Sequence, residues 1–296
     1  MATKKSQKII DGAIFQSIMN QTIMFLLLLL ILSGCDKNDA CSISFKEEYE
    51  QLETHKLAVY TRITNSKYLL VFESGLGDDH HVWQVKKVAE EAGKKVDVVL
   101  YDRAGYGKST IENQARNLEK LSSELKVIID KFANDRKVIL VGHSLGGLII
   151  RDYAIKNPEK IAALLFVDTS HEDYNQPTQL VEDLIYNSFN SSFGADFGGT
   201  REARELIESL AYVSLLPHLP NVPVVVLTSM KQDEANNSSD ETNHKTRQDW
   251  LNAHGQLKNG VSDFTHIQTT KSGHYIMKEE PNLVIDNISF LLSKLP

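Results

Sequence analysis

The sequence predicts an α/β fold in which helices cover a mostly parallel β-sheet. Short apolar runs alternate along the chain with segments of helical period, the pattern that βαβ units produce. The chain has 296 residues, of which 42% are hydrophobic and 24% charged, so it can bury one large core. Its 16 glycines and 7 prolines are too few for a collagen-like or low-complexity chain. Disordered and fibrous proteins are therefore excluded.

The apolar runs predict seven strands. They span Leu57–Ile63, Tyr68–Phe72, Val96–Tyr101, Lys137–Val141, Ala162–Val167, Val222–Leu227 and Thr265–Thr269. Helices are expected between them, at Val82–Ala92, Asn117–Ala133, Leu145–Lys156 and Asn282–Leu295. Residues 171–221 break the alternation with polar and amphipathic sequence. We expect this segment, called the lid below, to be a helical insertion after the strand Ala162–Val167.

The N-terminal segment has the pattern of an export signal. Several lysines precede the apolar run Ile23–Leu32, whose ten residues are too few for the roughly 20 that span a bilayer as a helix. The run ends at Leu32-Ser33-Gly34-Cys35, which resembles a bacterial lipobox. We therefore expect residues 1–34 to be a lipoprotein signal peptide, Cys35 to carry the lipid, residues 35–46 to form a polar tether, and residues 47–296 to form the domain. The alternative is a signal segment that is not lipidated.

This reading predicts an exported protein, anchored by its lipid to a bacterial membrane on the periplasmic face or at the cell surface. The formal net charge is −7 at pH 7, and no basic stripe interrupts it. An acidic surface repels phosphate backbones, so a nucleic-acid partner is not expected.

The strongest chemical signal is Gly142-His143-Ser144-Leu145-Gly146, which matches the G-x-S-x-G nucleophile elbow. It lies between a predicted strand and a predicted helix, the context that this motif requires. The sharp turn holds the serine in a strained conformation, and a side chain at either flanking glycine would collide with a neighbouring element. Ser144 is therefore the candidate nucleophile.

A serine hydroxyl needs a base to remove its proton. His274 lies on the loop between the last predicted strand and the C-terminal helix, and the pKa of a free histidine is close to neutrality. Among the 10 histidines of the chain, its position makes His274 the candidate base.

The third group must be a carboxylate that orients the imidazole. Asp233 follows the strand Val222–Leu227 and is the first choice, whereas Asp168 ends the strand Ala162–Val167 and is the alternative. Glu234 is a further possibility. All of them preserve the chain order serine, acid, histidine.

Backbone amides must also stabilise the negative oxygen that forms when serine attacks a carbonyl. The glycine-rich segment Glu73–Asp78 follows a predicted strand, and its backbone can aim an N–H at that oxygen. The expected oxyanion donors are the amides of Leu76 and Leu145.

No cofactor and no metal are expected. The segment from Gly75 begins like a dinucleotide loop but lacks its third glycine, and Asp102 replaces the first glycine of a phosphate loop that ends at Lys108-Ser109. His80 and His81 adjoin two aspartates without the spacing of a known metal motif.

Together, the segments FESGLGDDHHVW, YDRAGYGKS, VGHSLGG, FVDTSHED and SGHYIMKEEP resemble the α/β-hydrolase superfamily. The resemblance runs from about Leu57 to Leu295. It implies an eight-stranded, mostly parallel sheet flanked by helices, a lid after strand six, no cofactor, and hydrolysis through an acyl-enzyme. The expected activity is cleavage of a carboxylic ester, with a small acyl compound as substrate. Amidase, thioesterase and perhydrolase activities share these motifs, and a non-catalytic ligand-binding lipoprotein on the same fold is the competing class.

Overall fold

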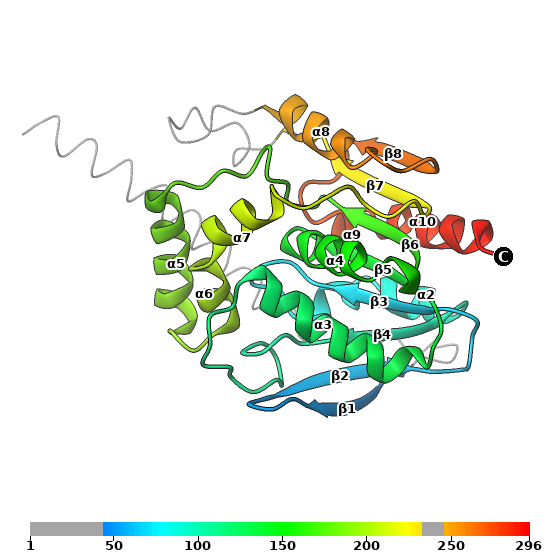
Figure 1. The fold of residues 1–296 in the computed structure, drawn as a ribbon, viewed down its shortest axis with the longest axis horizontal. Coiled ribbons are helices and arrows are strands. Elements are labelled where there is room, and N and C mark those ends of the chain that lie inside the picture. Colours follow the sequence, from blue (N-terminus) through cyan, green and yellow to red (C-terminus); the bar gives the residue numbers. More distant parts are fainter. Residues whose placement is uncertain (1–43, 233–245) are drawn as a thin grey trace, which may run out of the picture. The chain divides into compact units, whose positions relative to one another are not determined.

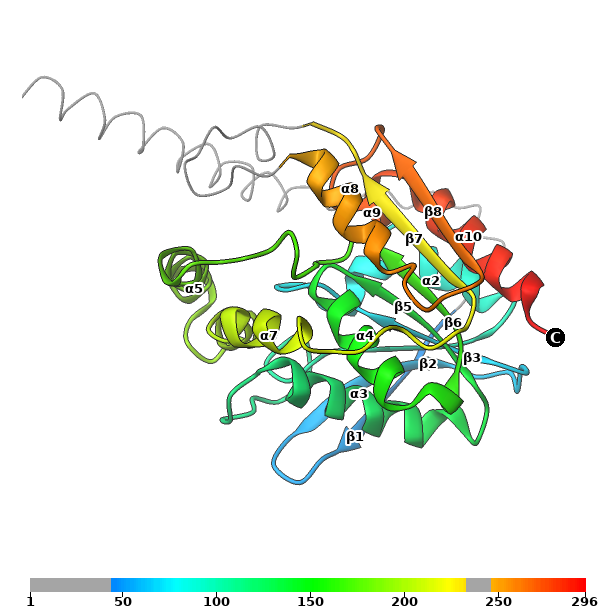
Figure 2. The same cartoon turned by 45° about the horizontal axis from the view of Figure 1, so that its top comes forward.

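The computed structural model describes residues 44–232 and 246–296, which build an eight-stranded sheet in the order β1-β2-β4-β3-β5-β6-β7-β8 (Figures 1 and 2). The strands are β1 (Lys46–Gln51), β2 (Lys56–Arg62), β3 (Leu69–Glu73), β4 (Asp97–Tyr101), β5 (Val138–His143), β6 (Ile161–Val167), β7 (Val224–Ser229) and β8 (Phe264–Thr269). The β1–β2 and β2–β4 pairs are antiparallel, and the other five are parallel. This is the α/β-hydrolase arrangement that the sequence predicts.

Helices cover both faces of the sheet (Figure 1). One face carries α3 (Leu118–Ala133), α4 (Leu145–Lys156) and α8 (Arg247–Gln256), and the other carries α2 (Val88–Gly93), α9 (Ile276–Glu279) and α10 (Pro281–Lys294). Each face has its own apolar cluster because successive side chains of a strand point to opposite sides. In β5, Leu140 belongs to the α3–α4 cluster and Val141 to the α2–α10 cluster.

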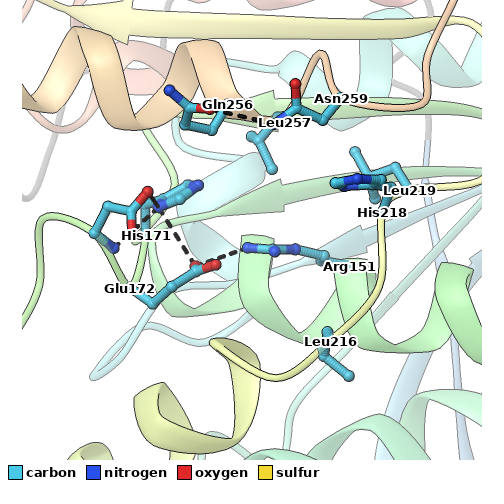
Figure 3. Close-up of a pocket in the computed structure, with 10 residues that line it drawn as sticks. Arg151, His171, Glu172, Leu216, His218, Leu219, Gln256, Leu257 and Asn259 are labelled. Carbon is cyan, nitrogen blue, oxygen red and sulfur yellow. Dashed lines mark hydrogen bonds and ion pairs between the residues drawn. The ribbon is translucent and has the colours of Figure 1, made fainter.

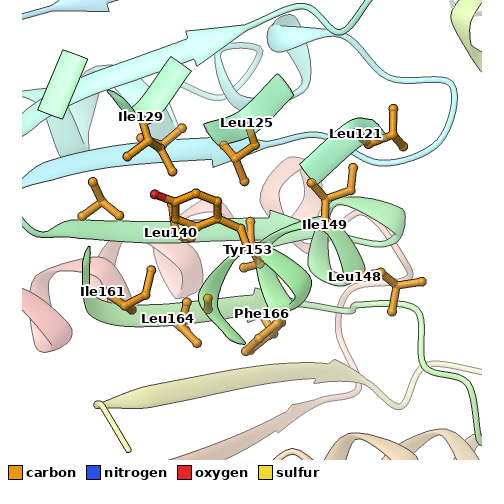
Figure 4. Packing of buried hydrophobic residues seen from close by; sticks show 14 of the residues in the cluster. Leu121, Leu125, Ile129, Leu140, Leu148, Ile149, Tyr153, Ile161, Leu164 and Phe166 are labelled. Atoms are coloured by element: carbon orange, nitrogen blue, oxygen red, sulfur yellow. The ribbon is translucent and has the colours of Figure 1, made fainter. Parts of the chain in front are cut away.

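The α3–α4 face shows how the helical pattern of the sequence becomes packing (Figure 4). Leu121, Leu125 and Ile129 recur at helical spacing on α3 and meet Ile149 and Tyr153 of α4 above the sheet. All five side chains are at most 1% exposed. Burying an aliphatic side chain of this kind contributes about 1.5–3 kcal/mol, so this face fixes α4, and with it the residue that precedes α4.

The seven predicted strands are present, with boundaries shifted by at most two residues. The sequence reading missed β1, an edge strand of mostly charged and exposed residues whose pairing with β2 leaves no apolar signal. The predicted helix Val82–Ala92 is divided into the 3₁₀ turn η2 (His80–Trp83) and α2, because Lys87 adopts a left-handed φ of 60°. Helix α8 was also missed.

The lid between β6 and β7 contains three helices, α5 (Gln179–Phe193), α6 (Gly198–Ala203) and α7 (Leu206–Val213). Figures 1 and 2 show them gathered at one end of the sheet. Helix α7 buries Leu210 and Val213, whereas α5 buries only Glu182 and leaves Leu180, Leu184 and Phe193 exposed.

Residues 1–43 and 233–245 lie outside the described part of the chain. The signal peptide, the lipid on Cys35 and Asp233 fall in these segments and stay predictions. Within residues 44–232 and 246–296, no helix combines the length and the apolar character needed to cross a bilayer.

Candidate active site

Ser144 occupies the turn between β5 and α4 in a strained conformation, with φ 52° and ψ −122°. The flanking glycines explain why the turn is possible. A Cβ on Gly142 would lie 2.6 Å from the carbonyl oxygen of Gly146, and a Cβ on Gly146 would lie 2.5 Å from that of Glu73. Real Cβ atoms essentially never approach so closely, so only glycine fits at either position. The packed backbone therefore enforces the sharp turn at Ser144, which is partly exposed.

His274 lies on the loop between β8 and α9, and its contacts with His143 place it beside this turn. Its carbonyl oxygen is 3.0 Å from Nε2 of His143, the residue before Ser144, and the two imidazole rings are 4.5 Å apart. Because a carbonyl can only accept, His143 donates from Nε2. Burial holds the pKa of His143 well below its usual value, so this ring is neutral at pH 7. Sequence reasoning gave His143 no role, although its place in the motif was visible.

The imidazole of His274 contacts the alternative acid, Asp168. Its Nδ1 lies 2.7 Å from Oδ2 of Asp168, whose side chain is fully buried while that of His274 is 42% exposed. The order of preference between Asp233 and Asp168 is therefore reversed. The physical reason is topological, because β6 lies beside β5 in the sheet and a residue at the end of β6 borders the elbow.

Asp168 is held by two further donors. Its Oδ1 accepts hydrogen bonds from the backbone N–H of Ser229 and from Nε1 of Trp250, each at 2.8 Å. Burial alone would raise the pKa of this carboxyl, but the hydrogen bond and the nearby charge of His274, with the indole of Trp250, outweigh it and lower the pKa. Asp168 is thus ionised at neutral pH. Its own φ of 43° is a second strained position beside the same site.

A buried histidine fixes the backbone behind Asp168. Nε2 of His254 lies 2.6 Å from the carbonyl oxygen of Thr169, and its Nδ1 lies 2.6 Å from Oγ1 of Thr228. Burial lowers the pKa of His254 to about 4, so the ring is neutral and donates from Nε2. Thr169 in turn donates from Oγ1 to the carbonyl oxygen of Ser144 at 3.2 Å. Trp250 and His254 were missed because both lie on α8, for which the sequence gave no apolar pattern.

A cavity of about 570 Å³ opens at Ser144, within the range of small-molecule sites. Both expected oxyanion donors, Leu76 and Leu145, line it with the serine. Leu145 is the first residue of α4, where backbone N–H groups have no partner within the helix. The other lining residues are apolar or uncharged, and are Leu148, Ser170, Tyr174, Asn175, Gln176, Pro177, Val181, Ile185, Leu206, Ser209 and Leu210.

Comparison with known proteins agrees with this geometry. Residues 68–287, about three quarters of the chain, match the family model of the alpha/beta hydrolase fold. The chain belongs to this family.

Two curated relatives and one solved structure illustrate the likeness. An uncharacterised protein of Bacillus subtilis, YqjL, is 26% identical over 220 residues, which cover 74% of this chain and 81% of the relative. Methylesterase 9 of Arabidopsis thaliana is 31% identical over 124 residues, or 41% of this chain and 48% of the relative. The structure of a thermophilic esterase from Thermogutta terrifontis superposes with a TM-score of 0.65 at 16% identity, covering 84% of this chain and 98% of the other. The fold is thus that of the hydrolases, and the chain is an enzyme of the α/β-hydrolase class.

This α/β-hydrolase has a second, smaller cavity of about 190 Å³ among Arg151, His171 and Glu172 and residues of the α7–β7 and α8–β8 loops (Figure 3). Arg151 forms an ion pair with Glu172 at 2.7 Å, so its charge is already balanced inside the protein. None of the predicted site residues lines this cavity.

Asp79, His80 and His81 bring three potential metal-ligand atoms within 4.8 Å of one another, the one such group found in residues 44–232 and 246–296. Their contacts are those of a capped turn. Asp79 accepts from the N–H of His81 at 2.9 Å and lies 3.0 Å from Nδ1 of the same residue, while Nδ1 of His80 lies 2.7 Å from the buried carboxylate of Asp102. Two ring nitrogens are therefore already used within the protein.

Proposed function

We propose that this α/β-hydrolase is a serine hydrolase that cleaves a carboxylic ester through an acyl-enzyme. The observation that carries the proposal is the contact at 2.7 Å between Nδ1 of His274 and the buried carboxylate of Asp168, beside the strained turn at Ser144. With Nδ1 occupied, the other ring nitrogen of His274 is free to act on the serine hydroxyl.

The proposed reaction gives each of these groups one task. Oγ of Ser144 attacks the ester carbonyl carbon while Nε2 of His274 takes its proton. The N–H groups of Leu76 and Leu145 bind the oxyanion of the tetrahedral intermediate. When the intermediate collapses, the C–O bond to the alcohol breaks and His274 returns the proton to the leaving oxygen. Water attacks the acyl-enzyme in the same way and releases the acid, while Asp168 stays ionised throughout.

The cavity favours an uncharged, largely apolar ester. No charged side chain lines it among the described residues, and burying a charge of the substrate there without a partner would be costly. The methylesterase among the relatives supports an ester as the substrate class. Serine, not aspartate, at the elbow disfavours epoxide opening, which requires a carboxylate nucleophile.

The test is hydrolysis of p-nitrophenyl esters with acyl chains of increasing length. The unmodified protein should hydrolyse them, and Ser144→Ala should lose about 10⁶-fold in kcat, to background. Ser123→Ala, an exposed serine on α3, is the matched control and should keep full activity. A Ser144→Ala variant that retained the activity would refute the serine mechanism. Absence of hydrolysis in the unmodified protein, together with ligand binding in the cavity, would favour a non-catalytic binding protein.

A further inference from the structure

A buried ionic cluster joins the lid to the loop that carries Leu76. Arg103, which follows β4, is 2% exposed, and its guanidinium makes a two-pronged contact with Glu202 of α6. Nε donates to Oε1 at 2.7 Å and Nη2 donates to Oε2 at 2.8 Å. Glu202 is itself 2% exposed. A buried, bidentate pair of this kind has both strength and a fixed geometry.

The same guanidinium holds the backbone of the oxyanion loop, residues 74–77. Nη1 of Arg103 donates to the carbonyl oxygen of Ser74 at 2.7 Å, and Nη2 donates to that of Gly75 at 2.8 Å. The carbonyl of Gly75 belongs to the peptide unit whose N–H is that of Leu76. Because a peptide unit is planar and trans, fixing this carbonyl also fixes the direction of the Leu76 N–H.

Tyr106 makes a second connection between the same two elements. Its hydroxyl donates to Oε2 of Glu202 at 2.7 Å and accepts from the N–H of Gly77 at 3.1 Å. Phe189 of α5 also packs on this loop, since a Cβ on Gly77 would lie 2.8 Å from its ring. Gly75 and Gly77, the neighbours of Leu76, are therefore connected to Glu202 of the lid through Arg103 and Tyr106.

We propose that Glu202 is a positioning residue, which acts through Arg103 and Tyr106 to aim the Leu76 N–H at the oxyanion. The lid then has a second role besides covering the cavity, because its docking completes the oxyanion site. This inference rests on the proposed function. It predicts that loss of Glu202 weakens stabilisation of the transition state and leaves binding of the ester almost unchanged.

The experiment compares three variants by kcat and KM on one ester. Arg103 also pairs with Glu73 at 2.8 Å, so Glu202→Gln keeps the shape of the side chain and removes one of the two carboxylate charges that orient Arg103. We expect kcat to fall about 10–100-fold, with KM within about 3-fold of the unmodified value. Complete loss of an oxyanion donor typically costs about 10²–10³-fold, so partial misalignment costs less. Tyr106→Phe removes only the hydroxyl and should lower kcat about 3–10-fold.

Glu182→Gln is the matched control. Glu182 is also a buried lid carboxylate, but its Oε2 accepts from the N–H of Ile207 at 3.0 Å and it makes no contact with the oxyanion loop. Its loss should lower the melting temperature and leave kcat unchanged. A trifluoromethyl ketone adds a second readout, since its adduct with serine places an oxyanion in the same site. Its inhibition constant should rise in parallel with the loss of kcat in Glu202→Gln.

The inference is overturned if Glu202→Gln and Tyr106→Phe keep kcat and ketone affinity, or if KM alone rises. If Glu202→Gln does not fold, Tyr106→Phe decides by the same criteria. These results differ from a failure of the proposed function, in which the unmodified protein would neither hydrolyse the esters nor bind the ketone.

Discussion

The turn at Ser144 and the pocket around Asp168 lie at the ends of neighbouring strands, yet they are built in opposite ways. The turn is local, because Gly142 and Gly146 lie within two residues of the serine and create the tight backbone approach. The Asp168 pocket is assembled from Ser229, Trp250 and His274, which lie 61 to 106 positions further along the chain. A short sequence motif is therefore enough to predict the nucleophile, whereas the acid can be identified only from the folded structure.

The difference can be tested first at the carboxylates. Asp168→Asn keeps the shape of the side chain but removes the negative charge that orients and stabilises the His274 cation, and we expect kcat to fall about 10⁴-fold. Asp233→Asn, at the rival position, should change kcat by less than about 2-fold. Steady-state hydrolysis of one p-nitrophenyl ester measures both. Equal losses in the two variants, or a larger loss in Asp233→Asn, would contradict the assignment of Asp168.

The local character of the turn is tested at its glycines. Gly146→Ala places a methyl group against the Glu73 carbonyl, and overpacking of this kind destabilises a fold by about 1–3 kcal/mol or more. Gly255→Ala is the control, because a Cβ there meets nothing within 4 Å and alanine favours the helix by up to about 1 kcal/mol. Urea unfolding monitored by circular dichroism gives both values. A Gly146→Ala protein as stable as the unmodified one would show that the turn does not depend on close packing.

The long-range character of the acid pocket is tested at its indole. Trp250→Phe removes one of the donors to Asp168, and a hydrogen bond to a charged group contributes about 1.5–3 kcal/mol, so kcat should fall about 10–100-fold. Trp83→Phe is the matched control, since Trp83 is equally buried and its Nε1 has no partner among the described residues. The control should lose stability and keep kcat. Equal kcat values for the two variants would contradict the role of Trp250 as a donor that supports Asp168.

The last prediction concerns Glu73, which ends β3 on the opposite side of β5 from Asp168. Burial raises the pKa of its carboxyl from 4.5 to about 7. The charge of Arg103 and the hydrogen bond from Tyr101 act in the opposite direction, while the nearby carboxylate of Glu202 raises the pKa further. The folded protein therefore holds the proton more tightly than the unfolded chain between pH 4.5 and 7, so this stabilisation is present below pH 4.5 and is lost as pH rises through 7. Unfolding free energies should show the unmodified protein losing about 1–3 kcal/mol relative to Glu73→Gln across this window. Parallel pH curves for the two proteins would refute this.

The same difference between local and long-range contacts decides which parts of the fold and the site can be predicted from the sequence. Seven of the eight strands, α3, α4 and the position of Ser144 follow from apolar period and a five-residue motif, which are local properties, whereas the charged edge strand β1 has no apolar signal. Two aspartates at the ends of adjacent strands satisfy the same chain order, so the choice between Asp168 and Asp233 depends on which strand borders β5 at the correct end. Likewise, Trp250 and His254 lie on a helix with little amphipathic signal, and the pairing of Arg103 with Glu202 crosses 99 positions.

The most direct test of the central claim is the site at which a fluorophosphonate reacts. The probe should add once to the unmodified protein, and peptide mass spectrometry should place the phosphonyl group on Ser144, with labelling abolished in Ser144→Ala and slowed in Asp168→Asn but not in Asp233→Asn. An adduct on any other residue, or an unmodified protein that hydrolyses esters while Ser144 stays free of the probe, would contradict the account.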